Sequence, residues 1–501
     1  MPSIWTKKNI DDLKREAQDS EHGLRRTLGP LALISLGIGA IVGAGIFVLS
    51  GVAAQHTGPA LVGSVILSGV GCAFAGLCYA EFSSMIPVAG SAYTYAYATV
   101  GEFLAWIIGW DLILEYAVGA TTVSIGWSGY LVSFLQKTLH WPFPVELSKS
   151  PWETLRLADG TVVHPIFNLP AAFIVILITT LLIIGIRESA NFNSLIVMVK
   201  VGVVLLFIFF GALYVHRANW HPFLPANQGT FGEFGLTGVL RGAGIIFFAY
   251  IGFDAVSTAA QEARNPERDM PIGILGSLAI CTLLYIAAVL VLTGIMPFRQ
   301  LNVPDPLALA IDSTAARWWL SPIVKIGALL GTTAVILVMM LGQTRVFYSM
   351  AHDGLLPRPF GKIHPRFRTP YISTALTGLC VALAGGLLPL RIVGELVSIG
   401  TLLAFVIVSG SVMGMRRLHP EIYRPFRTPF VWFVGPMGMI VCLAQMAGLP
   451  GDTWLRLFIW MAIGLCVYFG YGRRRSVLQN QERRRELEQA AAPQAVRRGG
   501  L

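Results

Sequence analysis

Charged residues are scarce in this sequence. Asp, Glu, Lys and Arg make up 13% of its 501 residues, whereas about 25% is usual for a soluble domain. Hydrophobic residues make up 54%, and many uncharged runs are long enough to cross a bilayer. The shortage of charge therefore excludes an ordinary soluble protein and indicates an integral membrane protein.

Motifs of soluble enzymes are also missing. The sequence has no G-x-S-x-G, P-loop or H-E-x-x-H motif, and no polar stretch large enough for a soluble active site. The nine histidines and six cysteines show no metal-ligand spacing. We therefore expect no enzyme activity, no cofactor and no metal. The net charge of +10 does not indicate nucleic acid, because the excess lies in short loops and the C-terminal tail.

The cysteines fall in apolar segments, where we expect small core residues. They are Cys72, Cys78, Cys281, Cys380, Cys442 and Cys466. No signal peptide is expected, since residues 1–30 are polar and the first apolar run is too long for one.

Apolar runs of spanning length predict twelve transmembrane helices. They lie near 31–54, 59–86, 101–135, 167–186, 190–216, 236–262, 272–296, 321–350, 371–389, 391–415, 430–448 and 453–472. Most of the 37 Lys and Arg residues fall on one side when the N-terminus is placed inside. The positive-inside rule then predicts cytoplasmic N- and C-termini in a cell inner (plasma) membrane. The basic cluster Arg473–Arg475 is expected to attract anionic membrane lipid.

The first run contains GIGAIVGAGIFVL, from Gly37 to Leu49. Gly39 and Gly43 have the spacing of closely packed helices, so this stretch alone leaves packing and a functional break equally open. The sixth run holds a second interrupted centre, in which Gly242 and Gly244 precede FFAYIGFDAVS. A pair of glycine-interrupted spans in corresponding halves indicates a transporter site near mid-membrane. This pairing favours a break in both spans.

The two interrupted spans are five apart, which predicts two halves of inverted topology. Residues 31–216 form the first repeat (spans 1–5) and 236–415 the second (spans 6–10). Residues 430–472 add two C-terminal helices. A cytoplasmic segment, 1–30, precedes them, and a basic cytoplasmic tail, 473–501, follows. The predicted fold class is thus an all-α integral membrane protein with a five-plus-five inverted repeat.

A broken helix offers ligands on both sides of the break. The half-helix that starts after Gly43 presents free amides and a positive dipole end, which suit a carboxylate. The half-helix that ends near Ile41 and the break near Phe248–Ile251 leave carbonyl oxygens that suit an ammonium group. Together they predict a site for an α-amino acid zwitterion.

Two ionisable residues lie near mid-depth in their spans. Lys200 is either paired for structure alone or is a fixed cation or proton carrier beside the first span. Glu115, with Asp111 one turn earlier, either hydrogen-bonds a neighbouring helix or faces the cavity and tunes a proton or a cationic side chain. We leave both pairs of alternatives open.

Three further acidic residues are assigned structural roles. Asp254 follows the sixth-span break and is expected to cap or steady the broken segment. Glu81 and Glu262 lie nearer the cytoplasmic ends, where we expect them to be solvated or bonded to loops.

Five motifs resemble known transporters. GIGAIVGAGIFVLSG and PVAGSAYTYAYATVGEFLAWIIGWDLILEY resemble the amino acid–polyamine–organocation (APC) superfamily. FFAYIGFDAVSTAAQEARNPERDMPIGI, RVFYSMAHDGLLP and TWLRLFIWMAIGLCVYFGYGRRRS are similar to its cationic amino acid transporter family. Twelve spans fit the bacterial type of that family. The resemblance implies the leucine-transporter-type fold.

The resemblance also implies roles for site residues. The amides of Gly43, Ala44 and Gly45 would bind the substrate carboxylate, and the carbonyls of Ile41, Phe248, Ala249 and Ile251 its amine. The Phe248 side chain would gate the site from outside. Lys200 would replace the sodium ion of sodium-coupled relatives, which implies proton coupling or exchange. Because Ala44 has no hydroxyl group, only backbone contacts carry over at that position.

These observations predict a secondary active transporter for proton-coupled uptake of cationic or small neutral L-amino acids by alternating access. An amino acid or polyamine exchanger, a channel and a non-transporting amino acid sensor remain open as alternatives. The expected partners are the amino acid, protons and membrane lipid, but not nucleic acid. The sequence leaves a small accessory membrane subunit open.

Overall fold

The computed structural model describes residues 4–8, 28–85, 91–156, 162–185, 190–227, 229–258 and 263–481. Its only strands within these residues form a short hairpin, in which β1 (Leu155–Arg156) pairs antiparallel with β2 (Val162–Val163). Nearly all other regular structure in the described residues is helical. Glu262, most of segment 1–30 and most of tail 473–501 lie outside the described residues.

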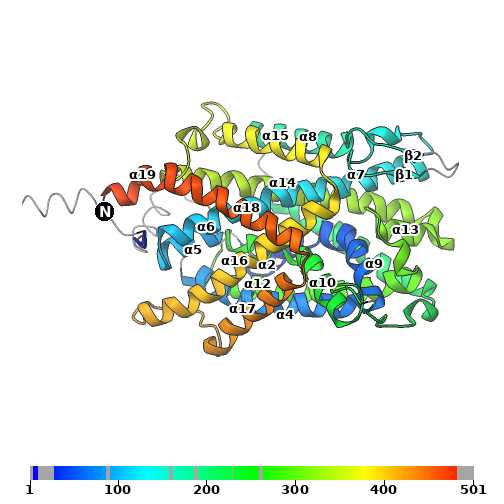
Figure 1. Cartoon of the computed structure of the whole chain (residues 1–501), viewed down its shortest axis with the longest axis horizontal. Helices are drawn as coiled ribbons and strands as arrows, with labels where there is room; N and C mark the ends of the chain where they lie inside the picture. Colours follow the sequence, from blue (N-terminus) through cyan, green and yellow to red (C-terminus); the bar gives the residue numbers. More distant parts are fainter. Residues whose placement is uncertain are drawn as a thin grey trace, which may run out of the picture.

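The helices follow the predicted apolar runs closely (Figure 1). In chain order they are α2 (Pro30–Ile41), α3 (Ser50–Thr57), α4 (Leu61–Met85), α5 (Ser91–Thr99), α6 (Glu102–Ile113), α7 (Gly119–Lys137), α8 (Leu169–Ile184), α9 (Ala190–Gly211), α10 (Gly235–Ile246), α11 (Ala255–Thr258), α12 (Pro266–Ile295), α13 (Pro306–Asp312), α14 (Leu320–His352), α15 (Tyr371–Leu387), α16 (Leu390–Leu418), α17 (Val431–Ala447), α18 (Gly451–Val467) and α19 (Arg473–Arg475). Helices α5 and α13 lie between predicted spans and were not expected from the sequence.

Seven helical stretches in the described residues are long and apolar enough to cross a membrane. The first, Pro30–Met85, counts as one because only a 3-10 turn at Gly58–Ala60 separates the two predicted runs within it. Four shorter apolar helices accompany them. The predicted all-α membrane architecture is thereby confirmed, while the number of twelve crossings stays a prediction.

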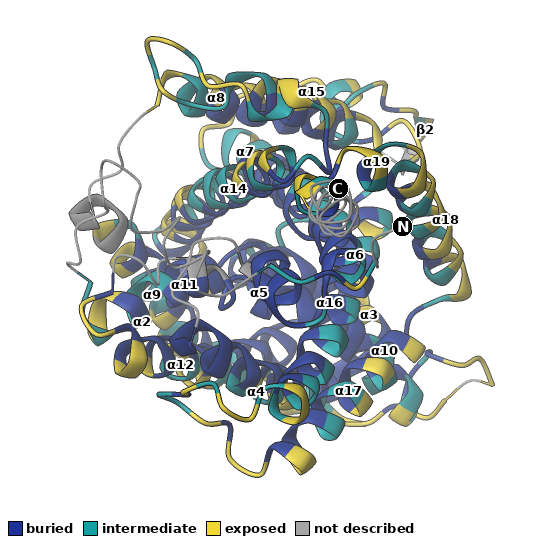
Figure 2. Cartoon of the chain, turned by 90° about the vertical axis from the view of Figure 1, so that its left-hand side faces the viewer, coloured by how far each residue is buried: buried dark blue, intermediate teal, exposed yellow. Residues whose placement is uncertain are grey.

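The helices pack in two groups around a buried centre. Helix α12 packs against α4 and α2, whereas α14 packs against α7 and α15 against α8. Figure 2 shows these groups on opposite sides of α16, with buried residues at the centre and exposed ones at the periphery. Two cysteines depart from the prediction: Cys380 and Cys466 are exposed rather than part of the core, because they lie on outward faces of α15 and α18.

The two terminal segments meet at one end of the molecule. The Lys8 ammonium lies 2.9 Å from the Asp353 carboxylate at the end of α14, and the Val477 amide donates to the Asp353 carbonyl at 3.0 Å. At the start of α6, the buried Glu102 carboxylate accepts hydrogen bonds from Ser476 and from Gln479 at 2.8 Å. Contacts from both termini therefore close this end of the bundle.

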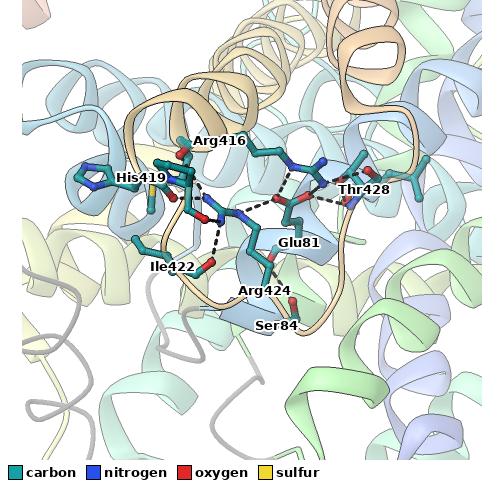
Figure 3. Close-up of polar contacts among 10 residues, drawn as sticks. Glu81, Ser84, Arg416, His419, Ile422, Arg424 and Thr428 are labelled. Atoms are coloured by element: carbon teal, nitrogen blue, oxygen red, sulfur yellow. Dashed lines mark hydrogen bonds and ion pairs between the residues drawn. The ribbon is translucent and has the colours of Figure 1, made fainter.

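A buried ion cluster ties α4 to α16 and to the loop after α16 (Figure 3). Arg416 donates from Nε and Nη2 to the two carboxylate oxygens of Glu81, at 3.0 and 2.6 Å. Arg424 lies 3.4 Å from the same carboxylate, and the Thr428 amide donates to it at 2.8 Å. Of the two roles expected for Glu81, the bond to a loop is the one present, and Glu81 is not solvated, since it is 2% exposed. The two arginines compensate the charge of the buried carboxylate.

We expect Glu81→Gln to lower the thermal midpoint of the purified protein strongly. Removing one partner of a buried ion pair typically costs about 3–5 kcal/mol, because the other charge stays buried and uncompensated. Glu421→Gln is the matched control, since Glu421 lies in the loop after α16 but is exposed, and its one ion pair among the described residues is with His419. An unchanged midpoint for Glu81→Gln, measured by fluorescence in detergent, would contradict the importance of the cluster.

Candidate functional site

The first predicted break is present in the first span. Helix α2 ends at Ile41, and Val42 takes an extended conformation with φ −72° and ψ 98°. The chain then returns to helical form with a π-helical turn at Gly45–Leu49 that leads into α3. The first amides of a restarted helix have no partner within it. The interruption therefore places free backbone donors beside Gly43 and Ala44.

The sixth span breaks opposite the first. Helix α10 passes into a 3-10 turn at Phe247–Tyr250, and Gly252 has φ +120°, a conformation that favours glycine. A Cβ atom on Gly252 would lie 2.7 Å from the carbonyl carbon of Ala40, and one on Gly45 would lie 2.0 Å from the Cα of Ala249. The two unwound segments thus touch through their backbones, which is why glycine is needed at both positions.

All seven residues predicted to bind the substrate lie buried at these two interruptions. They are Ile41, Gly43, Ala44, Gly45, Phe248, Ala249 and Ile251. The Ile251 amide donates to the Phe248 carbonyl at 3.2 Å. The structure therefore brings together the amides and carbonyls that the sequence nominates.

Lys200 reaches the first break from α9. Its Nζ atom donates to the carbonyl of Gly39 at 2.6 Å and lies 3.3 Å from the carbonyl of Val42. The side chain is 1% exposed. These carbonyls belong to the last turn of α2 and to the unwound residue after it, so the ammonium group stabilises the negative end of this half-helix. Lys200 therefore contacts the broken first span directly.

Glu115 lies where the third span departs from regular helix. Residues Leu114–Val118 form a π-helical turn between α6 and α7, a feature often found at functional sites. The Glu115 carboxyl group is buried and has no hydrogen-bond partner among the described residues. It lies close enough to Asp254 for their charges to affect each other, and Asp254 accepts a bond from Tyr116 at 3.0 Å. Asp254 also accepts from the Gly252 amide at 3.2 Å, so it steadies the sixth-span break as predicted.

Comparison with known proteins assigns the family. Residues 28–469 match the sequence profile of the family described as amino acid permease. The chain belongs to the amino acid permease family. It is accordingly a multi-pass transporter of the APC superfamily and not an enzyme, as predicted, and the family implies the leucine-transporter-type fold.

Three relatives illustrate the range of this family. The permease is 46% identical over 480 residues to a methylthioribose transporter of Bacillus subtilis, covering 95% of this chain and 100% of that one. It is 46% identical over 478 residues to the branched-chain amino acid permease BcaP of the same organism, covering 95% and 99%. It is 36% identical over 423 residues to the vacuolar cationic amino acid transporter 4 of Arabidopsis thaliana, covering 84% and 68%.

Sequence reasoning missed Tyr285 of α12. Its buried hydroxyl group lies 2.8 Å from the carbonyl oxygen of Ile41 and 3.0 Å from that of Ala249, one on each broken span. Both carbonyls were predicted to bind the substrate amine. The available signal was a lone tyrosine in the apolar run TLLYIAAVL, because a buried tyrosine hydroxyl usually needs a hydrogen-bond partner.

We expect Tyr285→Phe to destabilise the empty permease and to strengthen its response to amine-bearing ligands. The variant removes the one hydroxyl hydrogen that the two buried carbonyls share. Leaving a buried acceptor unsatisfied costs about 1–3 kcal/mol, and a bound ammonium group would supply new donors. Tyr250→Phe is the matched control, since its buried hydroxyl donates to the Val65 carbonyl at 3.0 Å. The measurement is the increase in thermal midpoint when amino acid is added to saturation. This increase should be larger in Tyr285→Phe than in the wild type and unchanged in Tyr250→Phe. Equal increases in the two variants would contradict a role of Tyr285 at the amine site.

The end of the molecule opposite the termini is closed by α13. The Asp312 carboxylate lies 3.1 Å from the Lys137 ammonium of α7 and 3.2 Å from that of Lys325 of α14, and it accepts a hydrogen bond from Ser321. Burial by itself would raise the pKa of Asp312, but the Ser321 hydroxyl and the two ammonium groups outweigh it and hold the pKa below its ordinary value. Asp312 therefore stays ionised and ties α13 to both helices.

Proposed function

We propose that this permease takes up α-amino acids by alternating access and couples their movement to protons. The observation that carries the proposal is the contact between the two unwound segments, with the Lys200 ammonium on the carbonyls of the first. Amides at one restarted helix and carbonyls at two helix ends suit the two charges of a zwitterion. The proposed substrate ligands are the amides of Gly43, Ala44 and Gly45 and the carbonyls of Ile41, Phe248, Ala249 and Ile251.

Proton coupling is assigned to Lys200. A protonated lysine makes charge-assisted hydrogen bonds to Gly39 and Val42, and these are stronger than bonds from a neutral amine. Loss of the proton would weaken the hydrogen bonds by which Lys200 connects α9 to the end of α2. Protonation would thereby bias the position of the first half-helix, which is a physical link between proton binding and alternating access.

A neutral, apolar substrate side chain fits the surroundings of the breaks best. Val335 of α14 faces Gly43, and the Met339 sulfur and the Phe248 ring lie near Gly119 of the third span. The branched-chain name of the BcaP relative agrees with such a pocket. A cationic side chain is the second candidate, because Glu115 and Asp254 place two buried carboxyl groups beside the sixth-span break.

The methylthioribose relative supplies a competing class of substrate. A sugar thioether has neither a carboxylate nor an amine, so it would not use the paired backbone donors and acceptors. This difference makes the choice testable.

Thermal shift of the purified permease tests the substrate class, because a ligand that binds the folded state raises its stability by mass action. The panel contains leucine, 4-methylpentanoate, 3-methylbutylamine, arginine and methylthioribose. We expect leucine to stabilise the protein and the two analogues, each lacking one charged group, to fail. Stabilisation by methylthioribose alone would refute the amino acid site, and stabilisation by arginine but not leucine would assign the cationic class.

Proteoliposomes separate the modes of transport. Saturable uptake driven by an imposed pH gradient into empty vesicles supports a proton-coupled carrier. Uptake only into vesicles preloaded with amino acid would assign an exchanger, unsaturable flux without counterflow a channel, and binding without flux a sensor.

We also infer twelve crossings of a plasma membrane, arranged as two inverted repeats followed by two helices, with both termini in the cytoplasm. The meeting of the two described terminal segments at one end supports an even number of crossings. The excess of Lys and Arg at that end supports the cytoplasmic side.

A further inference from the structure

A pocket outside the transport site opens at the terminal-segment end of α14. It has a volume of about 540 Å³, within the range of sites that hold small organic ligands. Its lining includes Tyr348 and His352 of α14, Arg358 and Lys362 around the following 3-10 turn, and Ile372 of α15. The end of α14, the 3-10 turn after it and the start of α15 therefore form one concave surface.

The charge of the pocket has one sign. Its lining contains Arg358, Lys362 and His352 and no acidic residue. Among the described residues, neither Arg358 nor Lys362 pairs with a carboxylate. Asp353, the nearest acid in the sequence, is held elsewhere by Lys8 and Tyr93, at 2.9 and 2.7 Å. The two exposed cations are thus available to an anion from outside the chain.

An apolar stripe leads away from the pocket along α15. Ile372 lines the pocket, and Leu376, Leu379 and Leu383 follow at helical spacing with exposed fractions of 43%, 58% and 49%. Residues three and four apart share one face of a helix. In a membrane protein such a stripe faces hydrocarbon, so the basic pocket sits where a headgroup lies when its acyl chain follows this face.

We propose that this pocket binds the phosphate group of an anionic phospholipid, with an acyl chain along the α15 stripe. Basic pockets between membrane helices on the cytoplasmic side are suited to anionic headgroups. The apolar stripe is what favours a lipid over a free phosphate, because a soluble anion would gain nothing from it. Arg358 and Lys362 supply the charge that selects an anionic headgroup over a zwitterionic one.

The test follows the full-length protein in phosphatidylcholine nanodiscs that contain increasing fractions of phosphatidylglycerol. The readouts are the apparent thermal midpoint and the lipid retained in native mass spectrometry. We expect phosphatidylglycerol to raise the midpoint of the wild type, and the Arg358→Gln/Lys362→Gln variant to need roughly thirty-fold more of it, from the contribution of two basic residues near a membrane surface. Both side chains are exposed, so the variant should match the wild-type midpoint in pure phosphatidylcholine.

The matched control, Arg417→Gln/Arg427→Gln, removes two exposed cations, one in the last turn of α16 and one in the loop after it. It should respond to phosphatidylglycerol within a few-fold of the wild type. If the thermal midpoints of both double variants responded equally to phosphatidylglycerol, the effect would be a general attraction of surface charge to the membrane, and the proposed site would be wrong. Full stabilisation by inorganic phosphate or glycerol 3-phosphate in place of the lipid would assign a free anion and overturn the lipid proposal.

Discussion

Gly45→Ala should strongly impair transport. The added Cβ atom would lie 2.0 Å from the Cα and 2.3 Å from the Cβ of Ala249, so the two broken spans must separate to admit it. Overpacking against side chains typically costs about 1–3 kcal/mol, and here the obstructing atoms include backbone that cannot rotate away. We expect uptake per folded molecule to fall at least roughly tenfold, since about 1.4 kcal/mol corresponds to that factor.

Two other glycines make this prediction specific. Gly202→Ala on α9 adds a Cβ with no atom within 4 Å, so it should leave uptake unchanged and slightly stabilise the helix. Gly43→Ala places its Cβ 2.6 Å from a methyl group of Val335, which can move, so a smaller loss is expected. Uptake and thermal midpoint should both be measured; wild-type uptake by Gly45→Ala would show that the two segments need not touch.

Lys200→Met should eliminate uptake driven by a pH gradient. The substitution removes the donor to the carbonyls of Gly39 and Val42 and also removes the only group that we assign to carry the proton. Lys200→Arg separates these two effects, because arginine keeps the charge and the donors but is not deprotonated in proteins. We therefore expect Lys200→Arg to keep most of the wild-type thermal stability and Lys200→Met to lose it. In neither variant should a pH gradient increase uptake.

The measurement is initial uptake into proteoliposomes with the interior more alkaline than the exterior, compared with no gradient. Lys149→Met is the control for loss of a cation, since Lys149 lies in the loop after α7 and its one ion pair within the described part of the chain is with Glu153 at 3.7 Å. Gradient-driven uptake that survives in Lys200→Arg would show that release of a proton from this residue is not part of the cycle.

The outline of the site could be predicted because it depends on local sequence. Glycines weaken a membrane helix wherever they cluster, and Lys200 in an apolar run must find partners near its own depth. The clustering of glycine predicts the breaks at Ile41–Gly45 and Phe248–Ile251. The need of a buried charge for nearby partners predicts that Lys200 contacts the broken first span. The structure agrees with both positions.

Other features of the site depend on which segments meet in space. Tyr285 lies in a third helix, and nothing in its own run shows that its hydroxyl would join carbonyls from both broken spans. The π-helical turn at Leu114–Val118 contains no glycine or proline from which it could have been predicted. The arginine partners of Glu81 are more than three hundred residues away in the chain. Long-range hydrogen bonds of this kind leave no periodic pattern.

The sequence by itself determined that this protein is an all-α membrane transporter with two interrupted helices. The reason is that a span in hydrocarbon must hydrogen-bond its own backbone N–H and C=O groups, so a glycine-rich stretch that weakens a span stands out in the sequence. The tertiary structure decided how the two interrupted helices and Lys200 come together. Packing between distant segments brings Gly45 against the backbone of Ala249 and Tyr285 of α12 to carbonyls of both breaks. It also brings Lys200 of α9 to the carbonyls of Gly39 and Val42. These choices are set by three-dimensional proximity between distant segments, which the order of residues along one span does not encode.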